Sequence, residues 1–251
     1  MPSAIYDMSA SELAQLADIV HALAGGGARA GLRAQVLPDM ARLLRCQFGA
    51  SYRWDAAARR FVDGAGHNMN PANLRAYDER YQFRDPISHR LRPLRRAALV
   101  DEALGRRELE HSEFYNDFLA RDGLHHGVNI YFADARGRDV GDLRLWRAAG
   151  AADFGERDLR LLDLLAPYFA RALRADEPAR AGAAAARLSP REQQVARLVA
   201  QGRGDREIAR ELGMAFTTVR THLKHAMEKL ECANRTALAA RWLAGHRPPQ
   251  D

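Results

Sequence analysis

The feature of the sequence that most restricts its fold is a series of short amphipathic helices over residues 187–246. Ser189 and Glu192 form a capping box around a proline at the first helical position, so a helix is expected to begin there and to end at Gly202. Three further helices are expected downstream, over about 205–212, about 216–230 and from about 234. Gly213 suits the tight turn between the second and third helices, because glycine adopts positive φ freely. This pattern predicts an all-α four-helix helix-turn-helix domain.

The third of these helices has two chemically distinct sides. On a helical wheel, its apolar side carries Val219, Leu223, Ala226, Met227 and Leu230. Its opposite side carries Thr217, Arg220, Thr221 and Lys224. The apolar side suits packing on the first two helices, and the polar side places hydroxyls and two cations near the helix start, where a recognition helix meets base edges. The alternative is an ordinary amphipathic surface helix, and the complete four-helix pattern favours the recognition helix.

Positive charge is concentrated in the same part of the chain. Residues 187–251 hold 12 Lys and Arg against 7 Asp and Glu, a net charge of +5, whereas residues 1–186 hold 26 against 25, a net charge of +1. This asymmetry predicts a polyanionic partner for the C-terminal part, most simply nucleic acid. Lys224 and Lys229 are the only lysines in the sequence. A Walker A phosphate loop and a Schiff-base lysine in the first part are therefore excluded, and we expect no enzyme activity.

The first part of the sequence has a mixed pattern of helices and strands. Helices are expected over 9–24, 32–45, 72–82, 109–121 and 154–173. Strands are expected over 48–55, 59–66, 97–101, 127–134 and 141–148, the last two as a hairpin. We predict an α+β sensor and dimerisation domain over 1–174, an antiparallel sheet flanked by helices. The Ala-rich stretch 175–186 is expected to be a linker, with a helical Ala run as the alternative, and 187–251 is expected to be the helix-turn-helix domain.

The C-terminal segment resembles the DNA-binding domain of the LuxR/FixJ family of bacterial transcription regulators. The resemblance covers 187–246 and rests on short stretches at 188–192, 207–209, 212–213, 218–223, 229–230 and 234–236. It implies that Arg220, Thr221 and Lys224 reach bases in the major groove. Candidates for phosphate contacts are Arg206, Thr217, Thr218, His225 and Arg235. Ala215 departs from the family pattern, which has Ser or Thr before the recognition helix, and Thr217 is the alternative cap one turn later.

The first part weakly resembles the autoinducer-binding domains of quorum sensors, which carry a Trp, a Tyr and an Asp-Pro pair whose Asp accepts the ligand amide. Tyr81 and the pair Asp85-Pro86 match, whereas Leu74 lies near the expected Trp and Val100 replaces a later aromatic residue. The candidate ligand-binding residues are Trp54, Tyr77, Tyr81, Asp85, Tyr131 and Trp146. The alternative is that Asp85 caps a turn and that the two tyrosines at 77 and 81 pack in the core.

The remaining patterns restrict cofactors, location and partners. The two cysteines, Cys46 and Cys232, lie in different expected domains, and neither the His125-His126 pair nor the histidines of the third helix make a metal site, so we expect no cofactor, metal or disulfide. With no signal peptide and no membrane span, a cytoplasmic location is expected. The predicted function is a homodimeric transcription regulator that binds a palindromic promoter site under the control of a quorum-sensing-like small molecule. The alternative is a ligand-independent co-regulator or anti-activator acting by protein contact, and RNA polymerase is a candidate partner in either case.

Overall fold

The computed structural model describes residues 8–25, 31–185, 187–230, 232 and 234–245. They form two compact units that divide between Leu173 and Arg174. The N-terminal unit contains, in chain order, α1 (Ala10–Ala24), α2 (Leu32–Leu43), β1 (Phe48–Asp55), β2 (Arg60–His67), α3 (Pro71–Glu79), α4 (Pro86–Leu91), β3 (Ala98–Leu99), α5 (Val100–Ala103), α6 (Arg106–Glu110), β4 (His126–Ala133) and β5 (Asp139–Arg147). Helix α7 (Glu156–Ala185) begins in this unit and crosses the division.

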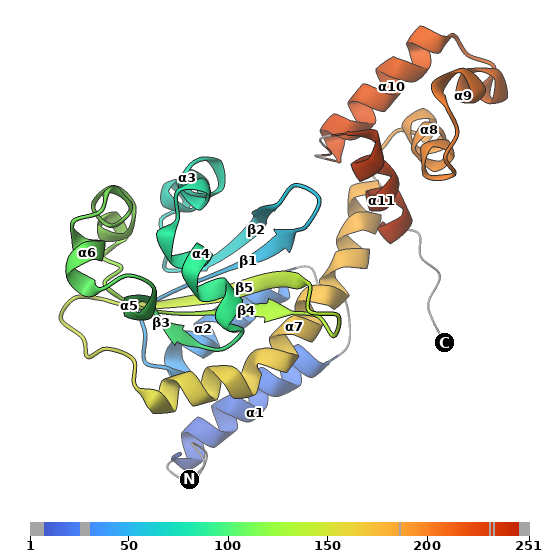
Figure 1. The fold of residues 1–251 in the computed structure, drawn as a ribbon. Helices are drawn as coiled ribbons and strands as arrows, with labels where there is room; N and C mark the ends of the chain where they lie inside the picture. Colours follow the sequence, from blue (N-terminus) through green and yellow to red (C-terminus); the bar gives the residue numbers. More distant parts are fainter. Residues whose placement is uncertain (1–7, 26–30, 186, 231, 233, 246–251) are drawn as a thin grey trace. The chain divides into compact units, whose positions relative to one another are not determined.

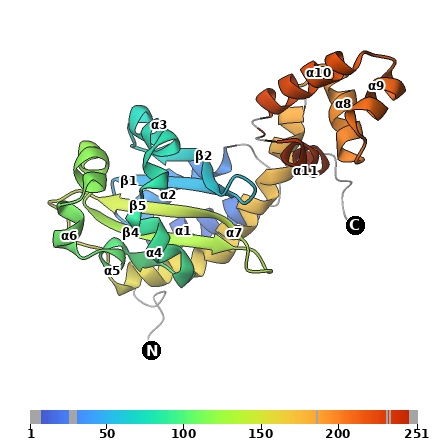
Figure 2. The ribbon, with the colours of Figure 1, turned by 45° about the horizontal axis from the view of Figure 1, so that its top comes forward.

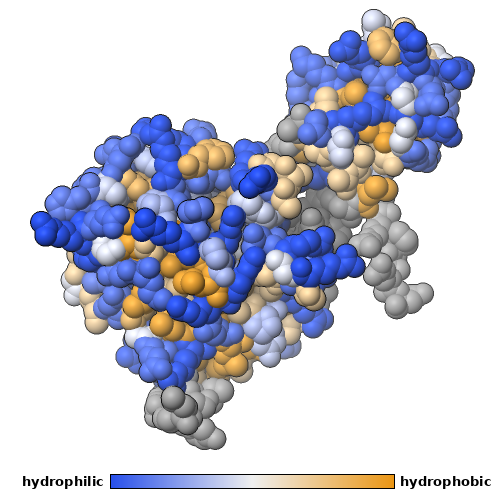
Figure 3. Space-filling model, viewed as in Figure 1, coloured by the Kyte–Doolittle hydropathy of each residue, from blue (hydrophilic) through white to orange (hydrophobic). Residues whose placement is uncertain are grey.

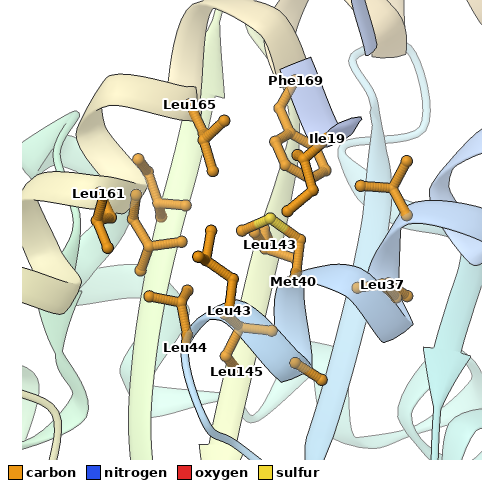
Figure 4. Packing of buried hydrophobic residues seen from close by; sticks show 14 of the residues in the cluster. Ile19, Leu37, Met40, Leu43, Leu44, Leu143, Leu145, Leu161, Leu165 and Phe169 are labelled. Carbon is orange, nitrogen blue, oxygen red and sulfur yellow. The ribbon is translucent and has the colours of Figure 1, made fainter. Parts of the chain in front are cut away.

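The N-terminal unit is built on one five-stranded sheet of order β2-β1-β5-β4-β3, in which every neighbouring pair is antiparallel. Figures 1 and 2 show α1, α2 and α7 on one face of this sheet and α3, α4, α5 and α6 on the other. Because side chains alternate along a strand, β4 and β5 contribute residues to both layers. Leu143 and Leu145 of β5 face the first layer, where they join a cluster with residues such as Ile19 and Phe169 (Figure 4). Trp146 faces the second layer.

The expected fold class, an antiparallel sheet flanked by helices followed by a helical helix-turn-helix domain, is confirmed by this architecture. The strand expected over 97–101 is limited to Ala98–Leu99, because α5 begins at Val100. The helices expected over 109–121 and 154–173 also differ in extent. The first is the short helix α6 followed by one π-helical turn at Tyr115–Leu119. The hydroxyl of Ser112 donates to the carbonyl of Leu109 and accepts from the amide of Tyr115, and such local hydrogen bonds compete with a continuous helix. Helix α7 continues through 175–185, as the high helix propensity of alanine favours.

The C-terminal unit contains α8 (Pro190–Ala200), α9 (Asp205–Leu212), α10 (Phe216–Lys229) and α11 (Arg235–Gly245). Its helices enclose a core of their own, which includes Val195, Leu198, Ile208, Val219, Leu223, Leu238 and Trp242. Ser189 and Glu192 form the expected capping box at the start of α8. Gly213 ends α9 with φ of +62°, the left-handed conformation that favours glycine.

The start of α10 corrects one expectation. The helix begins at Phe216, and Ala215 is its N-cap without a side-chain hydrogen bond. The suggestion that Thr217 caps the helix one turn later was wrong, because Thr217 already lies inside it. Its carbonyl accepts a hydrogen bond from the hydroxyl of Thr221, at 3.1 Å.

Candidate DNA-binding surface and buried polar cluster

Helix α10 carries an exposed, positively charged side. Arg220 and Lys224 are exposed and lie one turn apart, whereas Val219 and Leu223, the residues directly before each of them, are buried in the core of the unit. Within the described ranges Arg220 forms no ion pair, and Lys224 approaches only Glu228, with 3.7 Å between Nζ and Oε1. The two cations are therefore available to an anionic partner.

Polar contacts hold this helix against the rest of its unit. Glu192 at the start of α8 is buried and accepts hydrogen bonds from Nζ of Lys229 at 3.0 and 2.7 Å, near the end of α10. Burial raises the pKa of Glu192, but the hydrogen bonds from Lys229 and Ser189 outweigh it and hold this pKa below its usual value. The carboxylate is thus ionised at neutral pH and fixes the relative placement of α8 and α10.

The other candidate DNA contacts occupy three different settings. Thr217, Thr218 and Thr221 are exposed on α10, and Arg206 is exposed on α9, without an ion pair in the described part of the chain. The side chain of His225 is half exposed, with Nδ1 at 4.0 Å from the carboxylate of Glu192. Arg235 pairs with Asp205 and donates to the carbonyl of Arg203, so its guanidinium joins the start of α11 to the start of α9. Contact of these residues with DNA stays a prediction.

In the N-terminal unit, a buried arginine lies at the centre of a polar cluster between the sheet and the α3–α6 layer. Nε and Nη2 of Arg144 donate to the same oxygen of Asp142, at 2.8 and 2.6 Å, and Nη1 donates to Asp85 at 3.3 Å. Its Cζ lies 4.5 Å from the ring centre of Tyr77 and 5.0 Å from that of Tyr52. Burial raises the pKa of Asp142, an effect that the adjacent guanidinium opposes.

Asp85 connects this cluster to helix α4. One carboxylate oxygen caps the helix by accepting from the amides of Ile87 and Ser88, at 2.9 and 3.0 Å. The other accepts from the hydroxyls of Tyr77 and Ser88, at 2.9 and 2.5 Å. The Ser88 hydroxyl in turn lies 2.7 Å from that of Tyr131. The carboxylate is therefore fully engaged by the protein's own groups.

The structure brings together four of the six candidate ligand-binding residues. Tyr77, Asp85 and Tyr131 belong to one hydrogen-bonded network, and Trp146 lines a small cavity beside it. Tyr81 is also buried but does not join this hydrogen-bonded network among the described contacts, and it stacks on Phe118 with ring centres 5.0 Å apart. Trp54 is only partly buried and lies under the guanidinium of Arg92, 4.3 Å from ring centre to Cζ. Their role toward a ligand stays a prediction.

The cavity beside the cluster has a volume of about 20 Å³, close to what one water molecule needs. Its lining combines the polar groups of Asp85, Asn129 and Arg144 with apolar side chains, among them Phe114, Leu119 and Trp146. Oδ1 of Asn129 is buried without a hydrogen-bond partner among the residues that the structure describes. Such a group is the natural place for an ordered water.

Sequence reasoning missed Asp142, Arg144 and Asn129. The signal that points to the first two is strand alternation: Trp146 was a candidate, and residues two and four positions earlier on β5 lie on the same face. Two oppositely charged residues, Asp142 and Arg144, on the strand face that also carries Trp146 indicate a buried ion pair.

Comparison with known proteins assigns the C-terminal unit. Residues 186–242 match the GerE family, described as bacterial regulatory proteins of the luxR family. The chain is 34% identical over 110 residues to the nitrate/nitrite response regulator protein NarL of Escherichia coli K12, covering 44% of this chain and 49% of NarL. It thus spans about half the length of that relative. The C-terminal unit is a helix-turn-helix domain by its fold, and it belongs to the luxR family.

Two further similarities extend beyond this domain. The monoamine regulon transcriptional regulator of Klebsiella aerogenes is 26% identical over 180 residues, which cover 70% of this chain and 76% of that protein. The crystal structure of Escherichia coli SdiA aligns over 86% of this chain and 87% of its own, with 21% identity and a TM-score of 0.39. Within the described ranges, none of the helices combines the length and the apolar character needed to cross a bilayer.

Proposed function

We propose that this chain is a sequence-specific transcription regulator that binds double-stranded DNA as a homodimer and is controlled through its N-terminal unit. The observation that carries the proposal is the exposed side of α10 in a luxR-family domain, where Arg220 and Lys224 present their charged ends to solvent and Lys224 approaches only Glu228 among the described residues. Arg220 and Lys224 then read bases, and Arg206 contacts phosphate. A two-fold dimer implies a palindromic site with half-sites about one helical turn apart, roughly 34–36 Å.

The test separates base reading from phosphate contact. Footprinting of the purified chain on the DNA upstream of its own gene, with and without cell extract, yields the binding site. Arg220→Ala is expected to cost about 1–3 kcal/mol of binding free energy and to relax the preference at one base position. Arg206→Ala is expected to weaken binding to every sequence alike. It should also reduce, by about one, the slope of log affinity against log salt concentration.

Arg107→Ala is the matched control, because Arg107 is an exposed arginine on α6 in the N-terminal unit, outside the proposed surface. The DNA affinity of the Arg107→Ala variant, and the salt dependence of that affinity, should equal those of the unchanged chain. Unaltered affinity and base preference in Arg220→Ala would contradict the assignment of α10 as the recognition helix. An equal loss with Arg107→Ala would indicate a diffuse electrostatic effect instead.

A second candidate function is favoured by the buried polar cluster. The acceptors of Asp85 and Asp142 are engaged by Arg144, Tyr77 and Ser88, and the adjoining cavity has room for about one water. We infer a ligand-independent co-regulator or anti-activator, in which protein contact at the N-terminal unit replaces a small signal molecule.

Thermal unfolding distinguishes the two forms of control. A small-molecule fraction of cell extract that raises the melting temperature of the N-terminal unit would support ligand control through the residues around Asp85. Stabilisation by the protein fraction alone, with an unchanged footprint in the small-molecule fraction, would support control by protein contact.

A further inference from the structure

Phe216 is an exposed aromatic residue at the first position of α10. Its exposed fraction is 43%, whereas the apolar residues Val219 and Leu223 that follow it on this helix are buried in the core. A single exposed apolar residue is ordinary on a protein surface. The position of this one matters, because the N-terminal residues of a recognition helix are those that contact base edges.

Phe216 and Arg220 are four residues apart on α10, so their side chains are neighbours on the helix surface. One helical turn advances about 5.4 Å, and stacked base pairs are about 3.4 Å apart. A ring at 216 and a guanidinium at 220 therefore face positions that are one or two base pairs apart.

The surroundings of Phe216 favour DNA over an apolar protein partner. The first two turns of α10, residues 216–222, contain three threonines, an arginine and a histidine and no acidic residue. Phe216 is thus an exposed apolar group among mainly polar and cationic residues of its own helix. Figure 3 shows one face of this unit, on which hydrophilic residues predominate. In the major groove, the apolar group that the base edges present is the C5 methyl of thymine.

We propose that Phe216 contacts the C5 methyl of a thymine and thereby makes that base a determinant of specificity, one or two base pairs from the base pair read by Arg220. This inference rests on the proposed function, because it requires that α10 enters the major groove.

The experiment removes one methyl group at a time from the binding site. Each thymine of the footprinted site is replaced singly by deoxyuridine, and affinity is measured for the unchanged full-length chain, Phe216→Ala and Phe216→Leu. The unchanged chain should lose affinity about fourfold at one thymine of each half-site, the value of one buried methyl group. Phe216→Ala should bind the site with thymine and the site with deoxyuridine at that position with equal affinity. Phe216→Leu should keep part of the difference in affinity between the two sites.

The outcomes separate this inference from the proposed function. If the chain binds its site but no thymine within two base pairs of the Arg220 contact is sensitive, the role of Phe216 is overturned and the regulator function stands. The same holds if Phe216→Ala keeps the full sensitivity of the unchanged chain, or if its only effect is a change of oligomeric state in sedimentation. Absence of sequence-specific DNA binding by the unchanged chain would overturn both the role of Phe216 and the proposed function.

Discussion

At the scale of single residues, the N-terminal unit is distinguished by charge buried inside its core. The side chain of Arg144 is 7% exposed and that of Asp142 is 0% exposed. Taking such charges out of water costs several kcal/mol per ion, which mutual attraction and further hydrogen bonds offset only in good geometry. Here the guanidinium lies against two carboxylates and several aromatic rings, so each charge depends on its partners.

Replacement of Arg144 by a residue of similar length therefore has a predictable cost. Arg144→Met should destabilise the N-terminal unit by about 3–5 kcal/mol, because it leaves buried carboxylates without a counter-ion. Urea unfolding followed by tryptophan fluorescence measures the loss.

A second substitution tests the reason for that loss. Adding Asp142→Asn to Arg144→Met should restore part of the stability, because it removes one of the uncompensated charges. If the double variant instead loses as much free energy of unfolding as the two single variants together, the ion pair is not what couples Arg144 and Asp142.

At the scale of elements, α10 differs from α8 in how it begins. Ser189 and Glu192 cap α8, whereas the N-cap of α10 is Ala215, whose side chain offers no acceptor. The backbone of Ala215, with φ of −67° and ψ of 147°, already has the extended conformation that a capping serine adopts. The helix is thus held by its apolar side and by the ion pair of Lys229 with Glu192.

A restored cap should stabilise the C-terminal unit. Ala215→Ser is expected to raise its free energy of unfolding by about 0.5–2 kcal/mol, because the new hydroxyl accepts from an otherwise unpaired amide in the first turn. Thermal unfolding of the full chain measures the gain. Ala215→Val is the control without an acceptor, and an equal gain in both variants would contradict the capping explanation.

At the scale of the whole molecule, the chain has separate cores for its two units. The clusters on the two faces of the sheet belong to the N-terminal unit, and the cluster of α8 to α11 belongs to the C-terminal unit. We expect unfolding in two transitions, because separate cores need not unfold together. In calorimetry, Arg144→Met should lower only the transition temperature of the N-terminal unit. Ala215→Ser should raise only the transition temperature of the C-terminal unit. A single transition that moves in both variants would show that the units unfold as one.

Local patterns in the sequence were sufficient for most elements. The strand expected over 48–55 is β1, and the helix expected over 205–212 is α9, because alternation, helical periodicity and Gly213 act through neighbours in the chain. The break after α6 and the length of α7 were not predicted. The first depends on the hydrogen bonds that the side chain of Ser112 makes in the fold, and the second on an Ala-rich run that is compatible with either linker or helix.

By itself, the sequence determined the helix-turn-helix domain and the polar side of its third helix, because caps, turns and apolar periodicity are local properties. Only the tertiary structure decided what surrounds Asp85. That carboxylate meets Arg144, 59 residues later in the chain, because β5 lies at the centre of the sheet with its charged face toward α4. Pairing of buried charges depends on distances between elements, which the spacing of residues along a chain does not contain.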